Sequence, residues 1–141
     1  MSLVHFQPRA DNGLVLRFCA AAGEPERADL YLNQAARMPD GWQLSYFGMF
    51  RGRPASPLRV CGYLDNAQKE ACAADPARLA RAFDAIGFEA YAGAMLAQVS
   101  ALMAASPATT EFQFDVLPDG SLGDTFAFGV QFGAWQPEAV Q

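Results

Sequence analysis

Alternating apolar and polar residues make the last third of the chain its clearest strand region. Between Thr109 and Phe132, five of the eleven phenylalanines alternate with polar or small residues on either side of the turn signal Pro118-Asp119-Gly120. A period of two places these phenylalanines on one face of two strands, and the turn residues connect the strands. The pattern therefore predicts a C-terminal β-hairpin with an aromatic face.

The length of the turn decides which residues of this hairpin face each other. A two-residue turn would put the apolar sets of the two strands on opposite faces, because a slip of one residue inverts every side chain. A three-residue loop over 118–120, with Gly120 in the left-handed conformation, makes the aromatic face continuous. We therefore expect the longer loop, which pairs Phe112 with Phe126 and leaves Asp124 opposite Phe114, on the aromatic face.

The first half of the chain contains further segments with strand-like alternation. They are Leu3–Phe6, Gly13–Ala20, Ala28–Asn33, Trp42–Phe50 and Leu58–Leu64. The turn signal Asp11-Asn12-Gly13 would pair the first two as a hairpin, and Pro8 would restrict the first strand to an edge. In Trp42–Phe50, the pattern puts Trp42, Leu44, Tyr46 and Phe50 on one side.

The period changes to that of a helix after this region. Asp75 and Pro76 are typical of a helix start, and Gly87 is typical of a left-handed helix end. A second helix is predicted over about Glu89–Ala104, while residues 65–74 are compatible with a loop or a short helix.

These elements predict an α+β fold in a single domain over residues 1–141. We expect one curved antiparallel sheet of about six or seven strands, with two consecutive helices packed on one face. The C-terminal aromatic β-hairpin is expected to pair with the N-terminal strands.

Charge is low and unevenly distributed along the chain. Charged residues make up 18% of the chain and the net charge is −5. All ten cations lie at or before Arg81, where eight acids leave +2, whereas the remainder has seven acids and no cation. This balance argues against nucleic-acid binding, which draws on Lys and Arg. The low charge favours a protein partner or a homodimer.

Cysteine and histidine usage indicates no metal site or cofactor. The three cysteines form no CxxC pair, and His5 is the only histidine. Such spacing is typical of reduced thiols in a cytoplasmic protein. The N-terminus lacks the features of a signal peptide, and no apolar run is suited to cross a membrane.

Asp124 is the most unusual candidate for chemistry. A carboxylate on an apolar face must be paired, neutralised or solvated, because an isolated buried charge is costly. The residue is then either a ligand-binding or acid/base group, or a surface group turned into water by a distortion at Gly123.

Three arginines, Arg51, Arg53 and Arg59, bracket the loop after the aromatic strand. Their guanidinium groups suit an anionic ligand or an acidic partner. Equally, they are the cations available to pair with the acidic C-terminal part of the chain.

The sheet aromatics are compatible with a plain core or with an apolar cavity between sheet and helices. The candidate ligand-binding residues are Trp42, Tyr46, Arg51, Arg53, Arg59, Phe114, Asp124 and Phe126.

These features favour a non-catalytic binding module that recognises a small apolar ligand or a protein partner, of an inhibitor, immunity or accessory type. The alternative is a small cofactor-independent enzyme. It would use Asp124 as acid or base in an aromatic pocket, with an arginine holding an anionic substrate. The enzyme requires Asp124 and an arginine to converge in one cavity.

Overall fold

The computed structural model describes residues 2–6, 12–50, 52, 55–106 and 109–130. These residues contain five strands and five helices. The strands are β1 (Ser2–Phe6), β2 (Trp42–Phe50), β3 (Leu58–Leu64), β4 (Thr110–Val116) and β5 (Leu122–Val130). The helices are α1 (Asn12–Ala21), α2 (Glu26–Arg37), α3 (Asn66–Ala74), α4 (Pro76–Ile86) and α5 (Gly93–Ala105).

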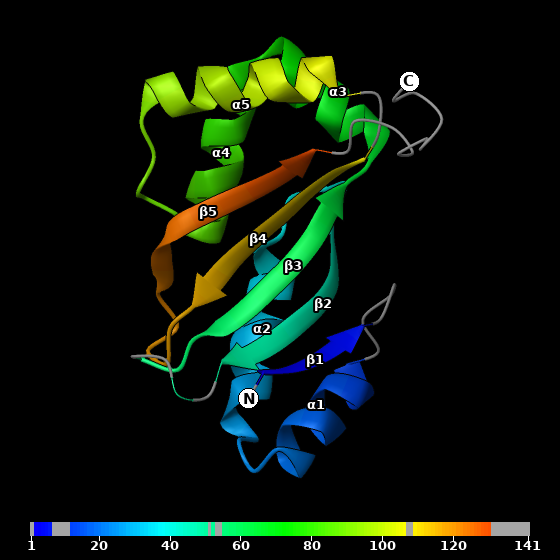
Figure 1. The fold of residues 1–141 in the computed structure, drawn as a ribbon, viewed down its shortest axis with the longest axis vertical. Helices are drawn as coiled ribbons and strands as arrows, with labels where there is room; N and C mark the ends of the chain where they lie inside the picture. The colour runs from blue at the N-terminus through cyan, green and yellow to red at the C-terminus, as the bar shows by residue number, and fades with distance from the viewer. Residues whose placement is uncertain (1, 7–11, 51, 53–54, 107–108, 131–141) are drawn as a thin grey trace, which may run out of the picture.

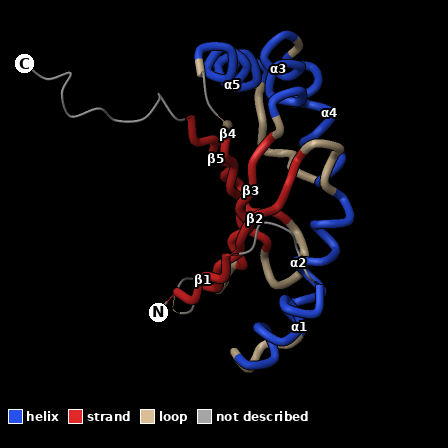
Figure 2. Tube along the Cα trace, turned by 90° about the vertical axis from the view of Figure 1, so that its right-hand side faces the viewer, coloured by secondary structure: helices blue, strands red, loops and turns tan. Residues whose placement is uncertain are grey.

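The strands form one antiparallel sheet in the order β1-β2-β3-β4-β5 (Figure 1). The described helices all lie to one side of this sheet, with α1 and α2 near β2 and with α3, α4 and α5 toward the other end (Figure 2). The sheet thus has a helix-covered face and, on its other side, a face that no described helix covers, which we call the uncovered face. The mixed α+β class with an antiparallel sheet is confirmed.

Two of the predicted strands are helices, so the expected number of strands was too high. The segments over Gly13–Ala20 and Ala28–Asn33 lie in α1 and α2. In α1, Val15 and Cys19 are both buried, whereas Leu16 is 48% exposed. A short apolar run fits both periods, and the helical spacing of four residues is the one that reaches the core. As a result, β1 pairs with β2, and not with residues 13–20.

Where a helix boundary depends on a capping residue, the structure has the boundary that the sequence predicted. The Asp75 carboxylate accepts a hydrogen bond from the backbone N–H of Ala77, and Gly87 ends α4 with φ of +82°. Residues 65–74, which the sequence left open, include α3, and the Asp65 carboxylate accepts from the N–H of Gln68. The second predicted helix, α5, begins later than expected, at Gly93.

Strands β4 and β5 are joined by the expected loop, but their pairing differs from the expected one. Gly120 has φ of +85°, and the N–H of Leu117 donates to the carbonyl of Ser121 at 2.8 Å. Further along, Phe114 pairs with Phe126, and the expected pair of Phe112 with Phe126 was wrong. The register shifts between Phe114 and Val116, where β5 contributes extra residues.

The hairpin also joins the sheet at a different place from the one expected. β4 pairs with β3, while β1 lies at the opposite edge of the sheet from β5. The prediction that the hairpin pairs with the N-terminal strand was therefore wrong. Each strand instead pairs with the strand next to it in the chain, an arrangement in which no connection has to cross another.

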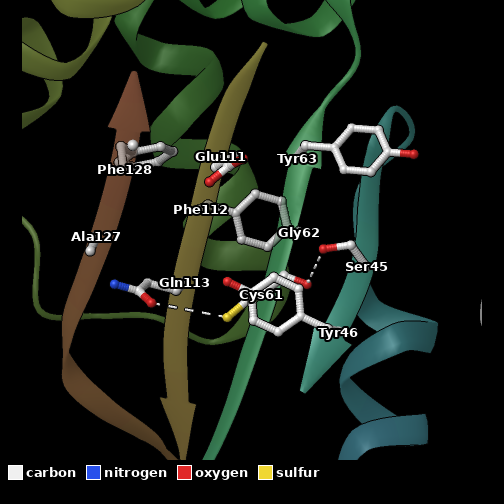
Figure 3. Close-up of a pocket in the computed structure, with 11 residues that line it drawn as sticks. Ser45, Tyr46, Cys61, Gly62, Tyr63, Glu111, Phe112, Gln113, Ala127 and Phe128 are labelled. Atoms are coloured by element: carbon white, nitrogen blue, oxygen red, sulfur yellow. Dashed lines mark hydrogen bonds between the residues drawn. The ribbon is translucent and has the colours of Figure 1, made fainter. Parts of the chain in front are cut away.

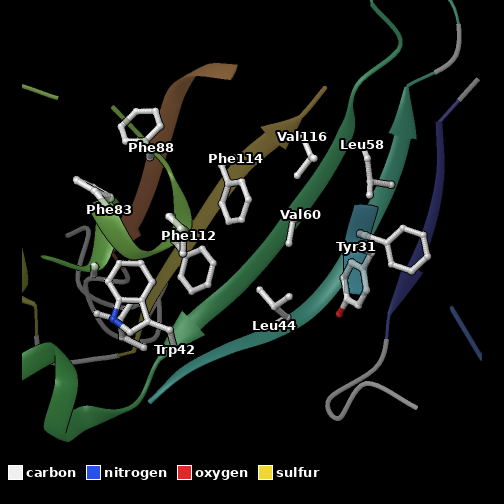
Figure 4. Packing of buried hydrophobic residues seen from close by; sticks show 14 of the residues in the cluster. Tyr31, Trp42, Leu44, Leu58, Val60, Phe83, Phe88, Phe112, Phe114 and Val116 are labelled. Atoms are coloured by element: carbon white, nitrogen blue, oxygen red, sulfur yellow. The ribbon is translucent and has the colours of Figure 1, made fainter. Parts of the chain in front are cut away.

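The core fills the space between the sheet and the helices (Figure 4). Phe83 of α4 is fully buried at its centre, with its ring 4.9 Å from that of Phe126 and 5.1 Å from that of Phe88. At the other end of the sheet, the ring of Phe47 lies 5.0 Å from that of Tyr31 and 5.1 Å from that of Phe18. Aromatic pairs at these separations and tilts add to the stabilisation that their burial provides.

Candidate functional site on the uncovered face of the sheet

A bulge in β2 determines which side chains reach the uncovered face. Leu44 pairs with Gly62 and Tyr46 pairs with Cys61, so Ser45 is an extra residue in β2. An extra residue switches the side of every residue that follows. Tyr46 consequently lies on the uncovered face, which corrects the prediction that it shares a face with Leu44.

Close packing at this bulge depends on a glycine in the neighbouring strand. A Cβ atom added at Gly62 would overlap with the carbonyl oxygen of Gln43 and the ring of Phe112. Ser45 is buried, and its hydroxyl donates to the carbonyl of Cys61 at 3.3 Å. The strands therefore approach each other at the bulge more closely than a side chain at position 62 would allow.

A depression of about 330 Å³ lies next to the bulge, over β2 to β5. Small residues of the strands, Cys61, Gly62, Ala127 and Gly129, contribute to its lining. The larger side chains around it are Tyr46, Tyr63, Glu111 and Gln113 (Figure 3). The depression exists because these long side chains surround positions where the side chain is short or missing.

The polar groups in this depression are coupled across the strands. The Cys61 thiol lies 4.0 Å from Oε1 of Gln113, to which it donates a hydrogen bond. A hydrogen bond with this thiol, together with burial, raises the pKa of Tyr46 to about 12. Burial also raises the pKa of Cys61 itself. Both groups are therefore neutral near pH 7, and they serve better as hydrogen-bonding groups than as a base or a nucleophile.

Next to the depression, Arg59 forms an ion pair across the sheet with Asp115. Its Nε lies 2.8 Å from Oδ1 and its Nη2 lies 2.9 Å from Oδ2. The guanidinium also lies over the ring of Phe50, 4.9 Å from its centroid. Arg59 thus pairs with the acidic C-terminal part of the chain, one of the two roles that its sequence position suggested.

The sheet separates the residues that the sequence proposed as one ligand-binding set. Trp42 and Phe114 are buried on the helix-covered face, where Trp42 lies 6.2 Å and Phe114 5.2 Å from Phe126 between ring centroids. Tyr46 and Arg59 lie on the other face. Two further candidates, Arg51 and Arg53, lie outside the described residues.

Asp124 lies apart from both groups, in solvent. Its side chain is exposed, and it accepts a hydrogen bond from the hydroxyl of Thr125 at 3.3 Å. It lines a second depression, of about 470 Å³, together with Arg37. The expected position of Asp124 opposite Phe114 was wrong, because Phe114 pairs with Phe126.

Sequence reasoning missed most of the residues around the first depression. Glu111 and Gln113 alternate with Phe112 and Phe114 in β4, and this alternation signals only a polar face. Tyr63 and Cys61 have the same relation to their neighbours in β3. No signal in the sequence indicated that these four residues meet at one place.

The comparisons with known proteins leave the site to be interpreted from its geometry. No protein-family model matches the chain, and no match was found among curated proteins or solved structures. Within the described residues, no group of three or more His, Cys, Asp or Glu side chains is arranged to hold a metal ion. None of the helices described here has the length and apolar character needed to cross a membrane.

Proposed function

We propose that this chain is a non-catalytic binding module that recognises its ligand on the uncovered face of the sheet. The observation that carries the proposal is the depression of about 330 Å³ beside Tyr46 and Tyr63, on a face that no described helix covers. Its volume is at the lower end of the range for small-molecule sites. Its lining combines aromatic rings with a few polar groups, the usual composition of such sites.

Packing on the other face favours this location over a cavity between sheet and helices. The rings of Phe114 and Phe126 are stacked at 5.2 Å, and Phe83 lies against the latter at 4.9 Å. These contacts support the role of the phenylalanines as plain core. The proposed ligand is a small molecule that contacts both the aromatic and the polar residues lining this depression, and recognition of a protein partner is the alternative within the same class.

The enzyme alternative has less support from the described residues. It required Asp124 to share a cavity with an arginine of the segment 51–59, but Arg59 is paired with Asp115, and the arginine that lines a depression with Asp124 is Arg37 of α2. The Cys61 thiol, with its raised pKa, is a poor nucleophile near pH 7.

A substitution that fills the depression tests the proposal. Gly129 lines it, and a Cβ added there would lie 3.6 Å from the Cβ of Glu111, an ordinary contact. Gly129→Val should therefore fold normally and block the site. Gly123→Val is the matched control, since a Cβ at that position of β5 would lie 3.5 Å from the Cβ of Asp115, outside this depression.

The measurement is native mass spectrometry of each protein purified from its own host, with gentle and denaturing spectra compared. We expect a small bound mass on the wild type and on Gly123→Val, and its loss from Gly129→Val. A small mass that remains on Gly129→Val would contradict the proposed location. A larger mass lost from Gly129→Val would favour a protein partner, and turnover of a substrate at this site would contradict a non-catalytic role.

A further inference from the structure

A second depression, of about 470 Å³, lies between three segments that are distant in the chain. It is lined by Arg37 at the end of α2, by residues 87–90 after α4, and by residues 120–124 of the β4–β5 turn and the start of β5. We call it the turn depression. Both helices lie on the helix-covered side of the sheet (Figure 2). The turn depression shares no lining residue with the depression on the uncovered face, so the two are separate places on the molecule.

The backbone that ends α4 positions the guanidinium of Arg37. Its Nε donates a hydrogen bond to the carbonyl of Ala85 at 3.3 Å. A Cβ atom added at Gly87 would lie only 2.7 Å from Nη2 and 3.3 Å from Nη1, so the guanidinium lies directly against the backbone there. This approach requires a residue without a side chain, and the φ of +82° at Gly87 favours glycine as well. The guanidinium is thus in place before any ligand binds.

The remaining donors of this guanidinium suit a carboxylate. Among the described residues, Arg37 forms no ion pair, and the hydrogen bond of its side chain uses Nε. The two Nη groups carry the other N–H donors of the guanidinium. A carboxylate accepts two parallel N–H bonds from such a group, and these charge-assisted bonds are about twice as strong as neutral ones. Arg37 therefore offers the turn depression an anchor for one carboxylate.

Two carboxylates complete the charged lining of the turn depression. Within the part of the chain that the structure describes, Glu89 and Asp124 are the only other charged residues that line it, and both side chains are exposed. Asp124 accepts one hydrogen bond, from the hydroxyl of Thr125 at 3.3 Å, and neither carboxylate forms an ion pair with a described residue. An ammonium group, with its three donors, suits the acceptor sites that remain. The lining thus presents both signs of charge.

The segments that carry these charges are fixed by contacts of their own. In the loop after α4, Phe88 is 1% exposed, and its N–H donates to the carbonyl of Phe83 at 2.9 Å. In the β4–β5 turn, the Asp119 carboxylate accepts from the N–H of Ser121 at 3.0 Å and from its hydroxyl at 2.6 Å. Binding a ligand here therefore requires little ordering of the chain, which favours affinity.

Ligands with one sign of charge fit this lining poorly. An anion on the guanidinium meets two carboxylates in the same depression, and a cation on those carboxylates meets the guanidinium. A metal ion has no set of ligands, since no three His, Cys, Asp or Glu side chains are grouped to hold one within the described residues. A small molecule with both a carboxylate and an ammonium pairs with both kinds of group. The volume of about 470 Å³ lies within the range of small-molecule sites.

We infer that the turn depression binds a free amino acid, with the ligand carboxylate on Arg37 and the ligand ammonium on Asp124 and Glu89. This inference goes beyond the proposed function and does not depend on it, because the two depressions have no residue in common. Exposed contacts of this kind give affinities of about 1 mM. Dialysis therefore removes the amino acid before the masses bound to the purified protein are measured.

Three small molecules of nearly the same size and shape test the inference. L-Alanine carries both charges, L-lactate has a hydroxyl in place of the ammonium, and L-alaninamide has an amide in place of the carboxylate. Each is titrated into the dialysed full chain at about pH 6.5, where an α-ammonium keeps its proton, and the backbone amides are followed by NMR. We expect L-alanine to bind about fivefold more tightly than either analogue. Its shifts should centre on the amides of Gly87, Glu89, Ser121 and Gly123.

Substitutions of Arg37 test the carboxylate end of the ligand. Arg37→Gln should weaken L-alanine and L-lactate about fivefold and should not weaken L-alaninamide, because only the first two carry a carboxylate. Arg37→Lys keeps the charge but not the two parallel donors, and should retain about half of the affinity for L-alanine. The lysine variant also provides the test if the glutamine variant does not fold. Arg78→Gln removes an exposed guanidinium outside the turn depression and is the matched control.

Substitution of Asp124 tests the ammonium end of the ligand. Because this side chain is exposed, Asp124→Asn should fold normally. It should weaken L-alanine and L-alaninamide about threefold, since Glu89 remains, and should not weaken L-lactate. Glu70→Gln removes an exposed carboxylate of α3 outside the turn depression and is the matched control. Gly129→Val, on the uncovered face, should leave all three affinities unchanged.

The failures of the two proposals give different results. Equal affinities for L-alanine and one of its analogues would overturn the zwitterionic ligand, and equal effects of Arg37→Gln and Arg78→Gln would show that the attraction is nonspecific. Loss of L-alanine binding in Gly129→Val would place the amino acid on the uncovered face, and the inference would be wrong. No shift from any probe would overturn the inference as well, while the bound mass on the purified protein tests the proposed function separately.

Discussion

The two faces of the sheet are built from the same strands and have opposite properties. On the helix-covered face, Phe112 and Phe114 are each 2% exposed and stack against the ring of Phe126 in β5. On the other face, the side chains that alternate with them along β4, Glu111 and Gln113, line a depression. One face is therefore filled by its own residues, while the other has a depression lined partly by polar side chains. Alternation along a strand gives one chain segment both roles.

The largest difference between the faces is expected in their contributions to stability. Phe83→Ala should lower the free energy of unfolding by about 4 kcal/mol, because it removes a fully buried ring from the centre of the aromatic cluster. Tyr63→Ala on the uncovered face should cost about 1 kcal/mol. Urea unfolding followed by circular dichroism measures both. Equal losses would show that the uncovered face contributes to stability as a core does.

A smaller loss of stability is expected for a substitution next to the β2 bulge. Gly62→Ala should cost about 2 kcal/mol, because the added methyl group meets the backbone oxygen of Gln43 and the ring of Phe112. Gly129→Ala is the matched control. Its Cβ would make only an ordinary contact with Glu111, so thermal unfolding should show no loss of stability. If the two substitutions have the same effect, the close approach at the bulge is not required.

The smallest effect concerns the ion pair on the uncovered face. A double-mutant cycle with Arg59→Ala and Asp115→Ala should give a coupling energy of about 0.5–1 kcal/mol, because the pair is bidentate but partly solvated. The single-contact pair of Arg81 with Asp75 is 63% and 48% exposed and should couple more weakly. Chemical unfolding at low and high salt measures both pairs. A coupling that does not decrease at 1 M NaCl would contradict this account.

Local signals in the sequence predicted several elements correctly. β2 and β3 have the bounds that their runs of apolar and β-branched or aromatic residues indicated. α4 begins at Pro76 after the Asp75 cap and ends before Gly87, because capping depends on residues that are neighbours in the chain. Such interactions join residues of a single element, so the sequence can predict them without knowledge of the rest of the fold.

Predictions that depended on contacts between residues distant in the chain were less successful. The runs over 13–20 and 28–33 are too short for periodicity to separate a strand from a helix, and contacts such as those of Val15 and Cys19 with the core decided for the helix. The candidate set of site residues combined Trp42 with Tyr46, because strict alternation ignores a bulge. Asp124 was placed opposite Phe114 for the same reason.

The sequence alone determined the α+β composition, the bounds of helix α4 and of strands β2 and β3, and the absence of cations from the last part of the chain. Only the tertiary structure decided which face each strand residue occupies. A one-residue bulge such as that in β2 shifts the register at a cost that local sequence patterns do not reveal, and every later side chain then changes sides. For this reason Tyr46, Tyr63, Glu111 and Gln113 could be recognised as one site only after the strands were paired.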